Sequence, residues 1–87
     1  MIVWNYRIIK NDQNPKKIFY EIREVFYDDY GKIEMVTAEA VAPMGETAEE
    51  LKEDLENMLQ DAKKYPILSF SEIDKIINKN LSKRSSK

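Results

Sequence analysis

The 87-residue sequence contains no cysteine and no histidine. Without cysteine, disulfide bonds and thiolate metal sites are excluded. Without histidine, the chain lacks the usual general base near neutral pH and the commonest metal ligand, so catalysis would depend on carboxylates, lysine, tyrosine or serine. We therefore expect a non-catalytic protein with no metal and no other cofactor.

Long apolar runs and glycine are also scarce. No stretch approaches the roughly 18 apolar residues that a membrane span requires, and the first seven residues lack the layout of a signal peptide. The two glycines, Gly31 and Gly45, are too few for a glycine-rich phosphate-binding loop. These absences favour a cytoplasmic protein that does not act at a membrane.

The net charge of -2 is unevenly distributed along the chain. Residues 1–38 carry six basic and six acidic groups, and residues 39–70 carry three basic and eight acidic groups. Residues 71–87 carry five basic and two acidic groups. Such asymmetry influences the choice of partner rather than the fold.

Three segments show the alternation of a half-buried β-strand. In the first, aromatic and β-branched residues occupy every second position, at Trp4, Tyr6 and Ile8. Clusters of turn-forming residues separate the three segments. We predict an antiparallel meander with strands over residues 3–10, 18–27 and 32–41.

The second of these strands changes phase in its middle. Ile22 follows the apolar alternation, but Val25 comes directly after Arg23 and Glu24. Two adjacent polar residues predict a β-bulge, with both side chains at least partly exposed. The bulge would place four side chains on one face: Tyr20, Ile22, Val25 and Tyr27. In the alternative, Glu24 points inward and pairs with a cation such as Arg7, because a buried carboxylate needs a partner.

A helix is predicted over residues 48–64. Thr47 and Glu50 have the spacing of a capping box at its start, and Pro66 ends it. We expect its apolar stripe to pack on the sheet, with Leu55 buried. The stripe comprises Leu51, Leu55, Met58, Leu59 and Ala62.

A second helix is predicted over residues 72–81, and Ser69 with Glu72, or Ser71 with Asp74, could cap it. Its apolar stripe comprises Ile73, Ile76, Ile77 and Leu81. The basic residues 82–87 have nothing to bury and are expected to be disordered. The predicted fold is a single α+β domain over residues 1–81, of the βββα type with a second short helix.

The stretch GETAEELKEDLENML, residues 45–59, follows the three predicted strands and resembles the HicB-like domain. The resemblance is carried by Gly45, Thr47, Glu49 and Glu50 at the entry to the helix. It implies a βββα core related to part of the RNase H fold. It also implies an antitoxin role, in which the domain masks a small RNA-cleaving toxin.

Four further stretches, WNYRII, YEIREVFYD, GETAEEL and YPIL, lie within residues 4–68. Together they look like a family of small uncharacterised bacterial proteins. This resemblance implies a stand-alone bacterial domain and transfers no catalytic or binding residue.

Two charged clusters are candidate binding sites. Glu49, Glu53 and Glu56 lie opposite the leucines of the first helix, where they would meet a basic partner or simply keep the helix solvated. A second cluster would contact nucleic acid weakly, or would complement the dipole of the second helix. It comprises Lys75, Lys79, Lys83 and Arg84. Asp28 and Asp29 are interpreted as turn residues rather than metal ligands.

We therefore predict a protein-binding module of bacterial or phage origin. Its partner would be another protein with a basic surface, masked by the acidic helix in the manner of an antitoxin or inhibitor. A small nucleic-acid-binding protein that uses the basic C-terminal end is the alternative. A homodimer is also left open.

Overall fold

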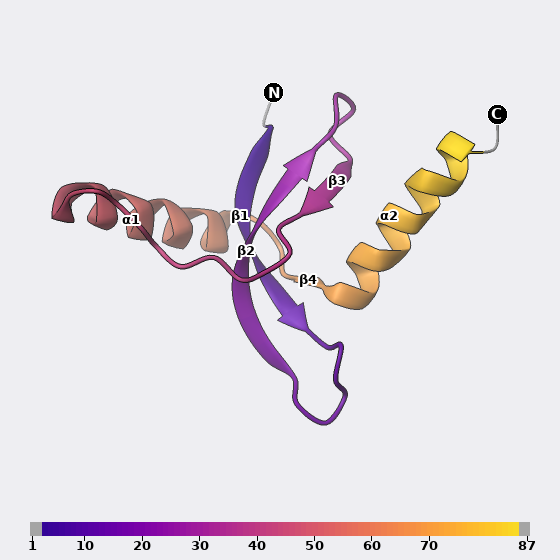
Figure 1. Cartoon of the computed structure of the whole chain (residues 1–87), viewed down its shortest axis with the longest axis horizontal. Helices are drawn as coiled ribbons and strands as arrows, with labels where there is room; N and C mark the ends of the chain where they lie inside the picture. The colour runs from indigo at the N-terminus through magenta and orange to yellow at the C-terminus, as the bar shows by residue number, and fades with distance from the viewer. Residues whose placement is uncertain (1–2, 86–87) are drawn as a thin grey trace.

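The structure, a computed structural model, describes residues 3–85 and the side chains of residues 3–79. It has an α+β fold in which a four-stranded sheet lies between two helices (Figure 1). The strands are β1 (Trp4–Asn11), β2 (Phe19–Tyr27), β3 (Ile33–Val36) and β4 (Leu68–Ser69). The helices are α1 (Ala48–Lys64) and α2 (Phe70–Ser85), and the strand order is β3-β2-β1-β4.

The three predicted strands form the antiparallel part of the sheet, which is mixed because β4 pairs with β1 in parallel. Ile9 of β1 is the partner of Leu68 in that pairing. The third strand is shorter than predicted and ends at Val36. The Thr37 hydroxyl donates to the Glu39 carbonyl oxygen at 3.1 Å. The same hydroxyl accepts from the Glu24 N–H at 3.2 Å, so a side-chain bond replaces the regular ladder here, while the Val41 N–H still donates to the Ile22 carbonyl oxygen.

The predicted bulge in β2 is wrong, although the ladder between β2 and β3 does stop beside Glu24, after the pair Val25–Val36, and Glu24 is partly exposed as predicted. The pairing of β2 with β1 is continuous from Phe19 to Phe26, and Arg23 is 7% exposed rather than partly exposed. The register instead shifts between Phe26 and Tyr27, where the pairing with β3 skips Glu34. This irregularity lies beside the turn after β2, where Gly31 has a φ of 78°.

The phase change in β2 reflects two faces that are covered by different helices. Arg23 and Val25 point toward α2, whereas Glu24 is opposite Tyr6 on the face toward α1. Val25 and Tyr27 therefore do not share a face with Ile22, as the bulge would have required. The alternative pairing of Glu24 with Arg7 is also wrong, because residues of even and odd number on these paired strands point to opposite faces.

The hydrophobic core lies between the sheet and α2. Ile9 and Val25 are fully buried and pack with Ile33, Leu68 and Ile73. Apolar side chains of α2 and the sheet surround this cluster: Tyr27, Val36, Phe70, Ile76 and Ile77. Helix α2 therefore carries more of the core than α1, which is of similar length and more amphipathic.

Helix α1 begins and ends where the sequence predicts, but it does not lie across the sheet. Figure 1 shows α1 on the side of the sheet opposite α2, with its axis running away from the strands. Met58 is its one buried residue, and Leu55 is 49% exposed. The prediction that Leu55 is buried is therefore wrong.

Helix α2 begins two residues earlier and ends later than predicted. Ser69 and Glu72 form the predicted capping box, since the Ser69 hydroxyl accepts from the Glu72 N–H and the Glu72 carboxylate accepts from the Ser69 N–H. The helical backbone continues through Ser85, so residues 82–85 of the predicted tail belong to α2, and residues 86–87 lie outside the described residues. Within residues 3–85, no helix is long and apolar enough to cross a membrane.

Candidate functional site

The start of α1 is fixed by the residues that precede it. A Cβ atom at Gly45 would lie 2.7 Å from the Glu50 carbonyl carbon, so only glycine fits where the chain passes this close to the helix. Thr47 caps the helix by accepting from the Glu50 N–H at 3.1 Å. The Glu50 carboxylate reaches back to the Glu46 N–H at 2.9 Å, one residue beyond the expected partner.

One residue of β1, Tyr6, holds α1 to the sheet. Its hydroxyl donates to Asp54 Oδ1 at 2.5 Å, and its backbone N–H donates to Asp61 Oδ2 at 3.0 Å. The other oxygen of Asp54 accepts from the Met44 N–H at 2.9 Å, which draws the preceding loop onto the helix. The ring of Trp4 packs edge-on against Tyr6, with 5.1 Å between centroids. These contacts hold α1 to the sheet from Asp54 to its C-terminal end and leave the residues before Asp54 projecting.

The protonation states at this junction follow from its geometry. Burial and the hydrogen bond to Asp54 raise the pKa of Tyr6, so the phenol stays a donor. The hydrogen bond from Tyr6, together with the Met44 N–H, lowers the pKa of Asp54. A charged Asp54 and a neutral Tyr6 are therefore the pair that holds α1 at neutral pH.

We expect Asp54 to make the stability of the protein depend on pH. Because its pKa is lower in the folded state than the ordinary 3.8, its contribution is complete above that value and is lost as the pH falls below it. In urea titrations from pH 7 to pH 2, the difference in unfolding free energy between wild type and Asp54→Asn should shrink toward acid pH. Glu53→Gln is the control for loss of one exposed charge. A difference that stays constant with pH would contradict this role.

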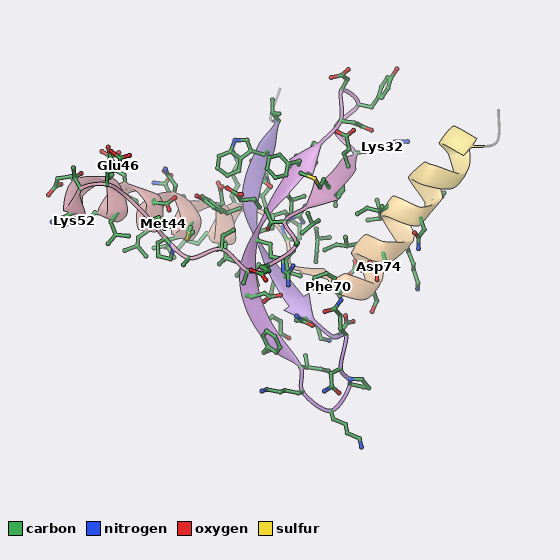
Figure 2. The ribbon with its side chains drawn as sticks, in the orientation of Figure 1. Lys32, Met44, Glu46, Lys52, Phe70 and Asp74 are labelled. Atoms are coloured by element: carbon green, nitrogen blue, oxygen red, sulfur yellow. The ribbon has the colours of Figure 1, made fainter. Side chains whose placement is uncertain are left out.

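The side of α1 that is turned away from these contacts exposes an apolar strip beside acidic groups. Leu55 is 49% exposed and Leu59 is 55% exposed, and Glu49, Glu53 and Glu56 are all exposed. Glu49 forms a surface ion pair with Lys52 at 3.3 Å. Figure 2 shows Lys52 and Glu46 at the end of the helix farthest from the sheet. We call the surface formed by these exposed leucines and acidic residues the arm patch: Glu49, Glu53, Leu55, Glu56 and Leu59.

The basic candidates on α2 are separated from the arm patch by the sheet. Lys75 and Lys79 are exposed, while the side chains of Lys83 and Arg84 lie outside the described residues. The two clusters of the sequence analysis are therefore not brought together, since α1 and α2 lie on opposite sides of the sheet (Figure 1).

The acidic turn after β2 has a structural role. One oxygen of Asp28 accepts from the Tyr30 N–H and the Lys32 N–H, both at 2.9 Å. This pattern confirms the interpretation of Asp28 as a turn residue. No group of three or more acidic side chains suited to hold a metal ion occurs in the described part of the chain.

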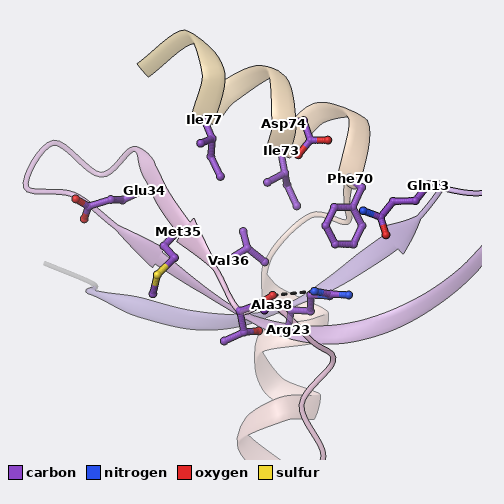
Figure 3. Close-up of a pocket in the computed structure, with 11 residues that line it drawn as sticks. Gln13, Arg23, Glu34, Met35, Val36, Ala38, Phe70, Ile73, Asp74 and Ile77 are labelled. Carbon is purple, nitrogen blue, oxygen red and sulfur yellow. Dashed lines mark hydrogen bonds between the residues drawn. The ribbon is translucent and has the colours of Figure 1, made fainter. Parts of the chain in front are cut away.

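A shallow groove of about 360 Å³ lies between β3 and α2. Figure 3 shows Val36, Phe70 and Ile73 around it, with Arg23 in its floor. The Arg23 guanidinium lies 4.6 Å from the centroid of the Phe70 ring and donates to the Thr37 carbonyl oxygen at 2.8 Å. It also forms a salt bridge with Glu21 at 2.9 Å. These contacts already engage Arg23, which therefore has a structural role here.

Sequence reasoning missed the junction that positions the arm patch. Asp54 and Asp61 lie seven residues apart, so they share one side of α1 with Met58. Two acids within an apolar stripe were a signal that this side meets a polar group, and Tyr6 supplies it. No residue pattern pointed to Tyr6 rather than to another donor.

No family model matches the chain, and neither the curated proteins nor the solved structures contain a match.

Proposed function

We propose that this protein is a non-catalytic protein-binding module whose contact surface is the arm patch. The observation that carries the proposal is the half exposure of Leu55 and Leu59 on a helix that projects from the sheet. Complete burial of a leucine side chain stabilises an assembly by about 1.5–3 kcal/mol, and about half of that is still available at each position. A partner that covers both leucines therefore gains affinity without any change in the fold.

The acidic residues of the arm patch determine the kind of partner. Six acidic side chains and one basic side chain lie between residues 46 and 59. Such a field favours a partner with a basic rim and accelerates its association, and it disfavours acidic surfaces. The proposed partner therefore presents apolar side chains bordered by lysine or arginine.

An antitoxin-like or inhibitor role is the specific form of this proposal. It is supported by the resemblance of residues 45–59 to the HicB-like entry motif, together with the acidic character of α1. In this role the arm patch would cover a basic surface on a nuclease. Catalysis by the chain itself is not proposed, because Tyr6 and Asp54 use their hydrogen bonds to hold α1 on the sheet.

The test of this function uses two variants of the arm patch. The first variant, Leu55→Ser with Leu59→Ser, removes the apolar strip. The second variant reverses the charge of the patch by changing three acidic residues to lysine: Glu49, Glu53 and Glu56. We expect each variant to lose the partners that the wild type captures at moderate salt, while the melting temperature stays close to that of wild type, because exposed substitutions rarely change stability by much.

Lys75→Ala with Lys79→Ala on α2 is the matched control and should capture the same partners as wild type. Capture that survives both arm variants would contradict the proposal. If the wild type instead shifts an oligonucleotide at low salt, and the α2 variant does not, the nucleic-acid alternative would replace it.

A further inference from the structure

We propose that a second copy of this chain covers the arm patch in a closed two-fold dimer. In this dimer the arm patch of each chain docks on the end of the β1–β2 hairpin of the other. The inference rests on the proposed binding role of the arm patch, and it identifies a second copy of the chain as one molecule that binds there.

The receiving surface lies at the end of the β1–β2 hairpin. It combines two exposed apolar side chains, Ile18 at 48% and Tyr20 at 60%, with three basic residues. We call this receiving surface the hairpin patch: Lys10, Lys16, Lys17, Ile18 and Tyr20. Like the arm patch, it has an apolar part bordered by charges of one sign.

The charges of the two patches are complementary. Between residues 46 and 59, acidic side chains outnumber basic ones by six to one, whereas residues 10–20 carry three lysines and one acid, Asp12. Asp12 is already engaged, because its carboxylate accepts from the hydroxyl and the N–H of Ser71. Lys10 is half-buried and also interacts with the charge of Asp12, so Lys16 and Lys17, which are exposed, are the main groups that meet the carboxylates of a partner's α1.

The two residues of the hairpin patch that belong to strands, Lys10 and Tyr20, lie on the same side of the sheet as α1. Lys10 and Tyr20 are direct partners across the β1–β2 ladder, as are Tyr6 and Glu24. Lys10 lies four residues after Tyr6 on β1, and Tyr20 lies four residues before Glu24 on β2. Alternation along a strand therefore places them on the face from which α1 projects. A helix that stands out from a sheet face makes a corner with it, and two such corners facing each other close around a two-fold axis. Each contact is then made twice, as an isologous interface requires.

The exposed area of a single chain is large enough to supply such an interface. The chain exposes 6575 Å², whereas a compact monomer of 10.3 kDa exposes about 5,400 Å². Its radius of gyration is 14.5 Å, against about 12 Å for a compact domain of 87 residues. Both helices that extend from the sheet contribute to the excess of about 1,200 Å², which exceeds the roughly 800 Å² per partner that a standard-size interface buries.

The dimer and a separate partner protein would compete for the same surface. The hairpin patch has the chemistry that the proposed partner needs, namely apolar side chains with a basic border. A partner that binds the arm patch must therefore displace the second copy, and the free dimer keeps the apolar strip covered until that partner is present.

Sedimentation equilibrium of the full chain and its charge-reversal variants tests the dimer. The arm variant carries Glu49→Lys, Glu53→Lys and Glu56→Lys, and the hairpin variant carries Lys10→Glu, Lys16→Glu and Lys17→Glu. Each variant alone should weaken dimerisation by about 100-fold or more, because like charges would then face each other in both contacts. An equimolar mixture of the two variants should regain the dimer, as should a single chain that carries all six changes.

A wild type that remains monomeric at 100 µM, or that forms open-ended assemblies, would overturn the closed dimer. So would a dimer that neither variant weakens, and so would variants that fail to recover on mixing. The hairpin variant separates this inference from the proposed function, because its arm patch is intact. If it is monomeric and still captures a partner protein, both proposals stand, and if wild type is monomeric yet captures the partner, only the dimer is wrong.

Discussion

Replacing Ile9 with alanine is expected to lower the free energy of unfolding by about 2–5 kcal/mol. Ile9 is fully buried where β1 pairs with β4 and α2 packs on the sheet, so the truncation leaves a cavity among Leu68, Val25 and Ile73. Domains of this kind have a total stability of about 5–15 kcal/mol, and the loss is therefore a large fraction of it. Urea titration followed by far-ultraviolet circular dichroism measures the effect.

Leu55→Ala is the matched control, because it removes an aliphatic side chain from a position that is half exposed. We expect it to cost less than about 1 kcal/mol, since little contact and no cavity are lost. If Leu55→Ala destabilised the protein as much as Ile9→Ala, then α1 would pack along the sheet in solution, and the arm patch would be part of the core.

The elements that depend on local sequence could be predicted closely. Helix α1 has the predicted bounds, and Thr47 caps it as predicted, although the Glu50 carboxylate accepts from Glu46 instead of Thr47. The capping box of Ser69 with Glu72 is complete. Caps act through residues three apart, so the chain needs no tertiary information to specify them. The exposure of the acidic residues on α1 follows from their position opposite the apolar stripe in the same way.

The direction of α1 relative to the sheet could not be predicted in this way. An apolar stripe shows which side of a helix is buried, but it does not show whether the helix lies across the sheet or projects from it. That direction depends on Tyr6, which binds Asp54 and Asp61 across more than 45 positions of sequence. The parallel pairing of the two-residue strand β4 with β1 could not be predicted for the same reason, because its partner Ile9 lies 59 positions away in the sequence.

The polar residues of β1 and β2 misled the prediction because burial was equated with apolar character. Asn5, Arg7, Asn11 and Arg23 are all buried on the face toward α2. Arg23 is tolerated there because Glu21, the Thr37 carbonyl and the Phe70 ring surround its guanidinium. A strand that buries a satisfied arginine needs no bulge, and the apparent phase change is the ordinary alternation of two different faces.

Arg7 illustrates this polar interior, and its replacement by methionine is expected to cost about 3 kcal/mol. Its Nε and Nη2 donate to the Pro66 carbonyl oxygen at 3.1 and 2.7 Å, and its Nη1 donates to the Tyr27 hydroxyl at 3.3 Å. Hydrogen bonds from a charged group contribute about 1.5–3 kcal/mol each, and methionine leaves the Pro66 carbonyl without this donor. Urea titration of Arg7→Met measures the loss.

Arg7→Lys separates the charge from the geometry of the guanidinium. Lysine keeps the positive charge but is a single-point donor, so it cannot contact Pro66 and Tyr27 in the same fork. We expect its stability to lie between that of wild type and that of Arg7→Met, with faster hydrogen exchange at Leu68 and Ser69, because the bond to Pro66 ties the segment before β4 to β1. If both variants match wild type, the packing of Ile9 and Ile73 alone positions β4 and α2. If both are destabilised and exchange rises mainly at β4, the Arg7–Pro66 contact is what links the sheet to the segment between the two helices.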